Sequence, residues 1–444
     1  MKPYWLQILF FLCLLSLSLP AVAEEAGYTY YSSSTHFDYY TDDTWTMDDS
    51  YVEQIETSLE ASYAAFVDRY GFDAPYNGGT ITIYISADPM IVGTAYANGV
   101  IWLGTGFEGD DFYYIPAHEL FHTIQYQYFT TADDYIMEGM AHWAEDVVDA
   151  DYDDLNTYMN YPNYWIEDLW GNGGIRPFAI FWRYLSEQLA TLRFTSLPAF
   201  GTQAIRKLLE EFRTIEETEG RYVDMGDMDT ILPNLTGDTD MTMARFYKQF
   251  LVALYAKDLG NPFTNGASAP VSYPLTKDEL LKHLPGDVVS PYDFVEDEEA
   301  GYPDLVLYSD GDLLSPDVSL SYTNTGVIYH SYYSTDGFQY YGDAEPIRIE
   351  IDSDVTAVEF EPSDIDDNIY YVMVVQYRGR RGGGKRIRVV DSLTDDASET
   401  VPIYSSDYPS DDFNAKYLIV FPFTMDDDPS DETGNNFEFT VTGL

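Results

Sequence analysis

The spacing of hydrophobic residues divides the chain into two parts. As far as about residue 260, apolar residues recur three and four positions apart in long runs, which is typical of amphipathic helices. From about Pro291, short alternating runs are separated by turns rich in Asp, Gly, Ser and Pro. We therefore predict an α+β protein in which a domain of helices and strands precedes an antiparallel β-sandwich.

The first predicted helix follows a short strand at His36–Tyr40. It begins at Asp48 or Asp49, ends at Gly71, and has a buried stripe at Val52, Ile55, Leu59, Tyr63, Phe66 and Tyr70. Two further strands are expected before the next helix, at Thr80–Ile85 and Gly99–Gly104.

Pro116 is expected in the first turn of a helix that runs to about Phe129. A strongly apolar helix is expected to start with Phe178–Leu185, and residues 204–212 and 241–259 also have helical spacing. We interpret the acidic stretch between the last two, through Asp240, as a loop.

The second part contains five predicted strands. They are Leu305–Leu307, Ile347–Ile351, Tyr370–Gln376, Tyr417–Val420 and Phe437–Val441. A basic hairpin tip is expected around Gly382–Gly384, because arginines and lysines surround these glycines. In an otherwise acidic chain this tip is predicted to dock on the protein's own surface, with a polyanionic cell-surface partner as the alternative.

The N-terminus has the pattern of a signal peptide over residues 1–23. Lys2 precedes an apolar run from Leu6 to Leu17, and Ala21-Val22-Ala23 is a small-x-small cleavage site. We expect cleavage near Ala23 and a mature protein that is secreted, periplasmic or on the cell surface. The single cysteine, Cys13, lies in the segment to be removed, so the mature chain is expected to contain no thiol.

Composition narrows the choice of partners. The formal net charge is −54, from 76 acidic and 22 basic residues, and such a surface repels nucleic acid and anionic membranes. A hydrophobic content of 45% nevertheless indicates folded cores. The acidity reflects either a solvated surface in a salty medium or Ca²⁺ sites. Asp364–Asp367 and Asp426–Asp428 are candidate Ca²⁺ ligands, but they lack an ordered loop spacing, which favours solvated loops.

The chemistry is concentrated in the segment His118-Glu119-Leu120-Phe121-His122. On a helix, His118 and His122 share one face and can bind one metal ion, while Glu119 lies close enough to act on a metal-bound water. The alternative is a helix with two ordinary surface or core histidines. Against it, three of the six histidines in the chain fall in one short segment, the third being His142.

Glu138 is the candidate third ligand, because hydrolytic zinc sites normally combine three protein ligands with one water. It begins a second predicted helix, which runs from Tyr135 to Val148. Glu145 is the alternative acidic ligand. His142, one turn after Glu138, is either a partner of a metal ligand or a competing ligand, and we favour the first interpretation.

Together these motifs resemble the gluzincin branch of zinc metallopeptidases, in which H-E-x-x-H precedes a helix with an E-G-x-A segment. Here that segment is Glu138–Ala141, and the longer stretch Glu138–Asp146 is similar to one in secreted bacterial proteins classed as metalloproteases. The resemblance covers about residues 30–260 in element order. It implies a zincin-like catalytic domain over residues 24–288, ahead of the β-sandwich over residues 289–444.

The resemblance also implies roles for single residues. His118, His122 and Glu138 would bind Zn²⁺, and Glu119 would be the general base. Gluzincins often stabilise the oxyanion with a tyrosine just before the apolar helix, but here the matching position is close to Arg176. Either Arg176 or a tyrosine of the 151–174 loop takes this role, or catalysis is impaired.

Two further alternatives stay open. Val100–Leu103 is either the rim strand that pairs with an extended substrate or an ordinary core strand. The protein is predicted to be a secreted zinc-dependent endopeptidase with a protein or peptide substrate and no membrane span. The alternative is a cell-surface binding or adhesion protein with a structural or inactive zincin domain.

Overall fold

The computed structural model describes residues 25–46, 49–88, 91–109, 111–130, 132, 134–148, 178–193, 202–236, 239, 241–256, 310–325, 327–328, 340–343, 347–362, 369–379, 385–390, 398–403, 413–426 and 436–444. Several predictions fall outside these ranges. They concern the signal peptide, the 151–174 loop, Arg176, the strand Leu305–Leu307 and the tip Gly382–Gly384. The predicted domain boundary between residues 288 and 289 also lies outside them.

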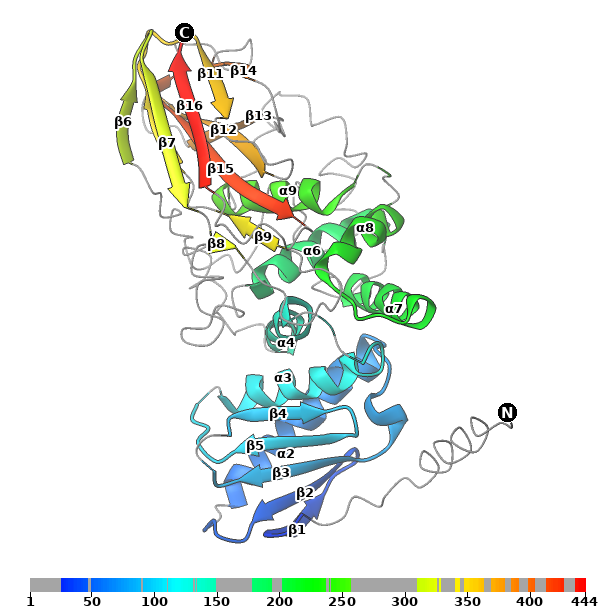
Figure 1. Ribbon diagram of the computed structural model, residues 1–444. Coiled ribbons are helices and arrows are strands. Elements are labelled where there is room, and N and C mark those ends of the chain that lie inside the picture. The colour runs from blue at the N-terminus through cyan, green and yellow to red at the C-terminus, as the bar shows by residue number, and fades with distance from the viewer. Residues whose placement is uncertain are drawn as a thin grey trace, which may run out of the picture.

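The N-terminal sheet has five strands in the order β1-β2-β3-β5-β4 (Figure 1). The central three run parallel, and β1 and β4 are antiparallel to their neighbours. The strands are β1 (Tyr28–Ser33), β2 (Phe37–Asp42), β3 (Ile81–Ser86), β4 (Gly93–Tyr96) and β5 (Val100–Gly104). All six residues of β3 are buried, as is usual for a central parallel strand covered on both faces.

This strand order decides between the two interpretations of Val100–Leu103. The segment belongs to β5, which pairs with β3 on one side and β4 on the other. It is therefore a core strand, and the suggestion that it forms the rim is wrong. The strand at the edge is β4, which the hydrophobic pattern did not reveal.

Three helices pack beside this sheet. They are α2 (Asp49–Tyr63), which continues as a π-helix over Ala64–Arg69, α3 (Asp111–Gln125) and α4 (Asp134–Val148). Figure 1 shows α3 between the sheet and α4. The expected buried stripe of α2 is confirmed, and Gly71 follows it with a positive φ of 76°. Because α3 already begins at Asp111, Pro116 lies inside the helix and not in its first turn.

Four more helices follow in the described part of the chain. They are α6 (Phe178–Arg193), α7 (Thr202–Glu219), α8 (Met228–Thr236) and α9 (Met243–Ala256). The prediction of a loop through Asp240 is wrong. Asp224 caps a short 3₁₀ turn at Met225–Asp227, and α8 buries Met228, Ile231, Leu232 and Leu235 behind a polar face. No helix among the described residues combines the length and apolar character needed to cross a membrane.

The C-terminal part forms two sheets. The seven-stranded sheet has the path β13-β12-β15-β10-β6, with β9 and β8 attached through β15, and the four-stranded sheet has the order β14-β11-β16-β7. The pairings are antiparallel except that of β6 with β10. The strands are β6 (Asp310–Leu314), β7 (Ser319–Thr325), β8 (Val327–Ile328), β9 (Tyr340–Asp343), β10 (Ile347–Ile351), β11 (Ala357–Pro362), β12 (Ile369–Gly379), β13 (Lys385–Val390), β14 (Glu399–Pro402), β15 (Phe413–Asp426) and β16 (Asn436–Gly443).

The seven-stranded sheet is buried on both faces where β12 and β15 meet. Tyr371, Met373 and Val375 of β12 share one apolar cluster with the four-stranded sheet. The residues between them, Val372 and Val374, belong to the cluster that contains the helices. Figure 1 shows α9 beside these strands. The seven-stranded sheet therefore shares a hydrophobic core with the helical part of the chain.

Candidate metal centre

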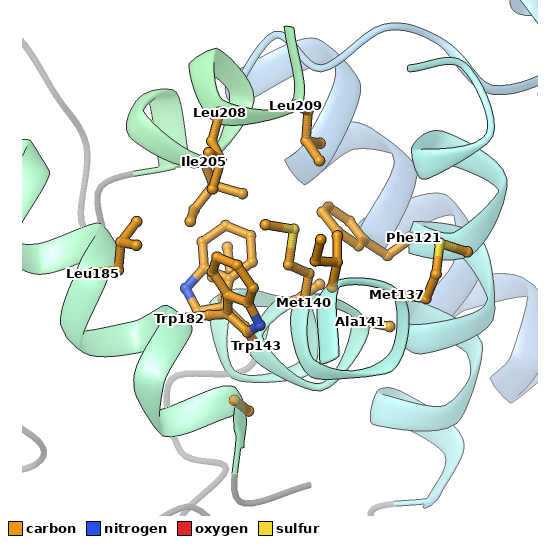
Figure 2. Packing of buried hydrophobic residues seen from close by; sticks show 14 of the residues in the cluster. Phe121, Met137, Met140, Ala141, Trp143, Trp182, Leu185, Ile205, Leu208 and Leu209 are labelled. Atoms are coloured by element: carbon orange, nitrogen blue, oxygen red, sulfur yellow. The ribbon is translucent and has the colours of Figure 1, made fainter. Parts of the chain in front are cut away.

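Apolar packing sets the rotation of α4. Met140, Ala141 and Trp143 are fully buried and point into a cluster formed with α3, α6 and α7 (Figure 2). Trp182 of α6 belongs to the same cluster. With these positions facing that cluster, the polar positions Glu138 and Glu145 of α4 lie against the histidines of α3.

Three donor atoms converge between the two helices. His118 Nε2 lies 3.1 Å from His122 Nε2 and 3.1 Å from a carboxylate oxygen of Glu138. The other Glu138 oxygen is 3.4 Å from His122 Nε2. Ligand bonds of about 2.0–2.2 Å at tetrahedral angles place neighbouring donors about 3.3–3.6 Å apart. The three atoms can therefore hold one metal ion with little movement.

The opposite side of each imidazole is also fixed. His118 Nδ1 is 2.7 Å from Glu145 Oε1, and His122 Nδ1 is 2.8 Å from Gln125 Oε1. The Gln125 amide then donates to the backbone oxygens of Ile136 and Met137, at 3.1 and 3.0 Å. Once the Nδ1 atoms carry the only ring protons, both Nε2 lone pairs can bind a cation, which displaces any proton on Nε2. Gln125 also ties the end of α3 to the turn that presents Glu138.

His142 joins the same network without reaching the three donors. Its Nδ1 is 2.6 Å from Glu145 Oε1, the oxygen that also faces His118. His118, His142 and Glu145 are close enough to form a second possible ligand group. However, both possible ligand groups use the same imidazole. His118 Nδ1 faces Glu145, while His118 Nε2 faces Glu138. Glu145 lies behind His118, in the position of an orienting carboxylate.

The charges of the site are strongly coupled. Burial alone would lower the pKa of His118, but the carboxylates of Glu138 and Glu145 outweigh it and raise the pKa to about 10. Burial would raise the pKa of Glu145, but His142 and His118 lower it to about 2. Burial opposes the shift at Glu138 as well, where the same imidazoles hold the pKa far below its ordinary range. The site has a negative field that a divalent cation can neutralise.

Glu119 differs from the two histidines in having a buried oxygen without a hydrogen-bond partner among the described residues. Its side chain is buried, and Oε2 makes no hydrogen bond within the described structure. Burial raises its pKa. The carboxylate lies against Gly93 of β4, where a Cβ atom would come within 2.8 Å of the Glu119 Cδ. Glu119 is thus a basic carboxylate with a free oxygen beside the three donors.

The structure brings the predicted ligand residues together, and two of the groups around them, Gln125 and Gly93, were not predicted. His118, His122 and Glu138 meet as predicted, with Glu119 beside them. Gln125 was missed, although its position three residues after His122 places it on the same side of the helix. Gly93 was missed because β4 was not recognised as a strand. Arg176 and the loop tyrosines remain predictions.

The other predicted binding features are only partly described. Strands β12 and β13 form the expected hairpin, with Arg378 opposite Lys385, but its tip lies outside the described residues. Of the candidate Ca²⁺ ligands, Asp364–Asp367 also fall outside them. Asp426 ends β15.

Comparison with known proteins adds no family. No family model and no curated protein matches the chain. Partial similarity extends to a structure of carbohydrate-binding modules from the β-sandwich superfamily, with 10% identity, a TM-score of 0.15, and coverage of 29% of this chain and 56% of that one. Infectious bursal disease virus strains Gx and Gt give 12% and 15% identity and TM-scores of 0.13, covering 36% and 39% of this chain and 36% and 38% of theirs. Scores of this size do not establish a common fold.

Proposed function

We propose that the protein is a secreted zinc-dependent endopeptidase of the gluzincin type. The observation that carries this proposal is the convergence of His118 Nε2, His122 Nε2 and the Glu138 carboxylate, with the unpartnered Glu119 beside them. Two imidazoles and one carboxylate are a ligand set of hydrolytic zinc enzymes. A site built for Ca²⁺ or Mg²⁺ would instead be dominated by oxygen ligands.

Each residue has a defined part in peptide hydrolysis. His118, His122 and Glu138 would hold the ion, which supplies Lewis-acid polarisation and lowers the pKa of water when bound. Glu119 accepts a proton from the water that attacks the scissile carbonyl and passes it to the leaving amine. Its burial suits this role, because a carboxylate of raised pKa is a stronger base. Glu145 and Gln125 hold the two imidazoles in the required tautomer.

The sheet edge beside the site supports a peptide substrate. β4 pairs with β5 along one side and packs against α3, so Gly93–Tyr96 is the edge strand next to Glu119. Val92 and Tyr96 are exposed there, at 60% and 49%. An extended peptide can add to such an edge by backbone hydrogen bonds, which brings its carbonyl groups past the general base.

The same proposal includes the finer fold assignment. A mixed sheet, an adjoining helix with H-E-x-x-H and a second helix with the third ligand support a zincin-like domain over residues 24–288. Two mainly antiparallel sheets that share a buried cluster support a β-sandwich over residues 289–444. Secretion rests on the signal pattern of residues 1–23.

A metal assay and a cleavage assay on two proteins test this function. The mature wild type is expected to bind one zinc ion per chain and to digest casein in a chelator-sensitive manner. Glu119→Gln is expected to bind zinc equally well and to lose cleavage. An active Glu119→Gln protein would refute the role of Glu119. A wild type that holds zinc but cleaves nothing would favour the binding or adhesion protein.

A further inference from the structure

Peptide hydrolysis needs a hydrogen-bond donor for the negative charge that develops on the scissile carbonyl oxygen. Removal of such a donor typically costs about 10²–10³ in kcat. The expected donors, Arg176 and the tyrosines of residues 151–174, lie outside the described part of the chain. Within it, Tyr126 is a candidate that sequence reasoning did not consider.

Helical register places Tyr126 on the metal-binding face of α3. It follows His118 by eight residues and His122 by four. Its backbone N–H donates to the His122 carbonyl at 3.0 Å, so the α-helical path continues past Gln125 as far as this residue. Residues four apart on a helix lie above one another, and long side chains lean toward the helix N-terminus. For Tyr126 that direction is toward the two histidines.

The surroundings of the Tyr126 hydroxyl agree with this placement. The groups that act on it electrostatically are Glu138 of α4, Glu119 of α3 and Tyr96 of β4. Helix α3 packs against both of the other two elements. The side chain is half-buried, and its hydroxyl makes no hydrogen bond to the described residues. Burial, followed by the two carboxylates, raises the pKa of Tyr126, so the O–H group keeps its proton at neutral pH.

We propose that Tyr126 is a catalytic residue whose hydroxyl donates a hydrogen bond to the oxyanion formed when water attacks the scissile carbonyl. The inference rests on the proposed peptidase function and assigns one further residue to it. The proton stays on Tyr126 throughout, and Glu119 alone carries the proton from water to the leaving amine. Tyr126 and Glu119 thus act on different oxygens of the same reaction.

Tyr128 provides a matched control. It lies two residues further along the chain and is fully packed, and its hydroxyl accepts the backbone N–H of Asp73 at 2.9 Å. The Arg213 guanidinium lies over its ring, 4.4 Å from the centroid. Removal of this hydroxyl breaks a structural hydrogen bond at a distance from the general base.

The experiment compares Tyr126→Phe, Tyr128→Phe and Glu119→Gln in the zinc-loaded mature protein, with a fluorogenic peptide as substrate. Tyr126→Phe is expected to lower kcat about 10²–10³-fold, to change KM less than about twofold, and to keep its zinc. Its affinity for a phosphonamidate peptide, which mimics the tetrahedral oxyanion, should fall by a similar factor. Tyr128→Phe is expected to keep kcat while its melting temperature falls.

Tyr126→His and Tyr126→Leu separate a donor from a packing role. The imidazole N–H of the first should recover part of the lost kcat, and the second should recover none. If Tyr126→Phe keeps kcat within about threefold of wild type while Glu119→Gln is inactive, the role of Tyr126 is refuted and the peptidase stands. If the zinc-loaded wild type has no chelator-sensitive activity, the proposed function fails, and the role of Tyr126 fails with it.

Discussion

The polar network between α3 and α4 and the cluster between the two C-terminal sheets are built from opposite kinds of residue. The first buries His118, His122, Gln125 and Glu145, all of them polar and joined by hydrogen bonds. The second buries a cluster of aliphatic and aromatic side chains. Its polar neighbour Lys416 is an exception, since its ammonium group lies 3.4 Å from two backbone oxygens of the loop beyond β10.

Apolar burial and buried hydrogen bonds stabilise these two regions in different ways. An apolar cluster stabilises in proportion to the area it buries and tolerates many arrangements of similar volume. A buried polar network requires a partner for nearly every atom, so it defines one geometry and costs free energy when one partner is lost. We therefore expect substitutions in the cluster between the sheets to change stability alone, and substitutions in the polar network between α3 and α4 to change the chemistry.

The largest effect is expected from Phe439→Ala in β16. The Phe439 side chain is fully buried between the sheets, and its loss should lower the free energy of unfolding by about 3–5 kcal/mol. Denaturant titration measures this change. Zinc affinity and kcat per folded molecule should match wild type. A large loss of zinc affinity in the folded protein would show that the two regions are not independent.

The second largest effect is expected from a methyl group at Gly93, which should lower the catalytic rate. In Gly93→Ala the new Cβ overlaps the Glu119 carboxylate, which must move by a substantial fraction of an ångström. A misplacement of about 1 Å at a reacting group can cost about 10² in rate. We expect kcat/KM to fall by about that factor with zinc content unchanged. Gly106→Ala is the control, because open space surrounds that position. Unchanged kinetics in Gly93→Ala would mean that β4 does not position the base.

Glu145→Gln should weaken metal binding by about 10- to 100-fold, the usual effect of losing the carboxylate behind a histidine ligand. The amide keeps nearly the same shape but removes the charge that faces His118 Nδ1 at 2.7 Å. Competition with a chromogenic chelator measures the zinc dissociation constant. Glu60→Gln removes an equally charged side chain far from the site and should leave that constant unchanged. If Glu145→Gln binds zinc as tightly as wild type, Glu145 does not orient the His118 imidazole for metal binding.

The smallest expected effect is a pH-dependent loss of stability at the contact between α2 and the turn that joins β1 to β2. Burial would raise the pKa of Glu60, but hydrogen bonds from Ser34 and His36 outweigh it and lower the pKa below 4.5. Its stabilising contribution is therefore complete above pH 4.5 and is lost as the pH falls through the lowered value. Since a quarter of the side chain is exposed, the effect should be no more than about 1 kcal/mol. Unfolding between pH 3 and 6 should show a flatter profile in Glu60→Gln. Identical slopes would contradict the contribution of Glu60.

Features that depend on residues close together in the sequence could be predicted, and features that depend on contacts between distant segments were harder to predict. The pairing of His118 with His122 depends only on helical register, so it could be predicted directly. Glu138 depends on the packing of two helices, and the motif around it supplied that information. β4 could not be found, because four residues containing Gly93 and Ala95 show no hydrophobic alternation. α8 was hidden because acidic residues surround its four buried apolar positions.

The burial of β12 on both faces could not be predicted from the hydrophobic pattern either. The run from Tyr371 to Val375 is apolar at every position. This pattern is the same for a strand inside one hydrophobic core and for a strand that contributes to two separate cores. Only the tertiary structure shows that alternate residues belong to different clusters.

The shared strand β12 has a consequence for how the molecule comes apart. Val372 and Val374 pack with the helical part, while Met373 and Val375 pack with the four-stranded sheet. Neither part can therefore unfold without exposing an apolar surface of the other. A scanning calorimeter should then record a single endotherm for the whole chain. If the proposed peptidase function holds, a chain that opens as one unit exposes few unfolded segments to cleavage by its own active site.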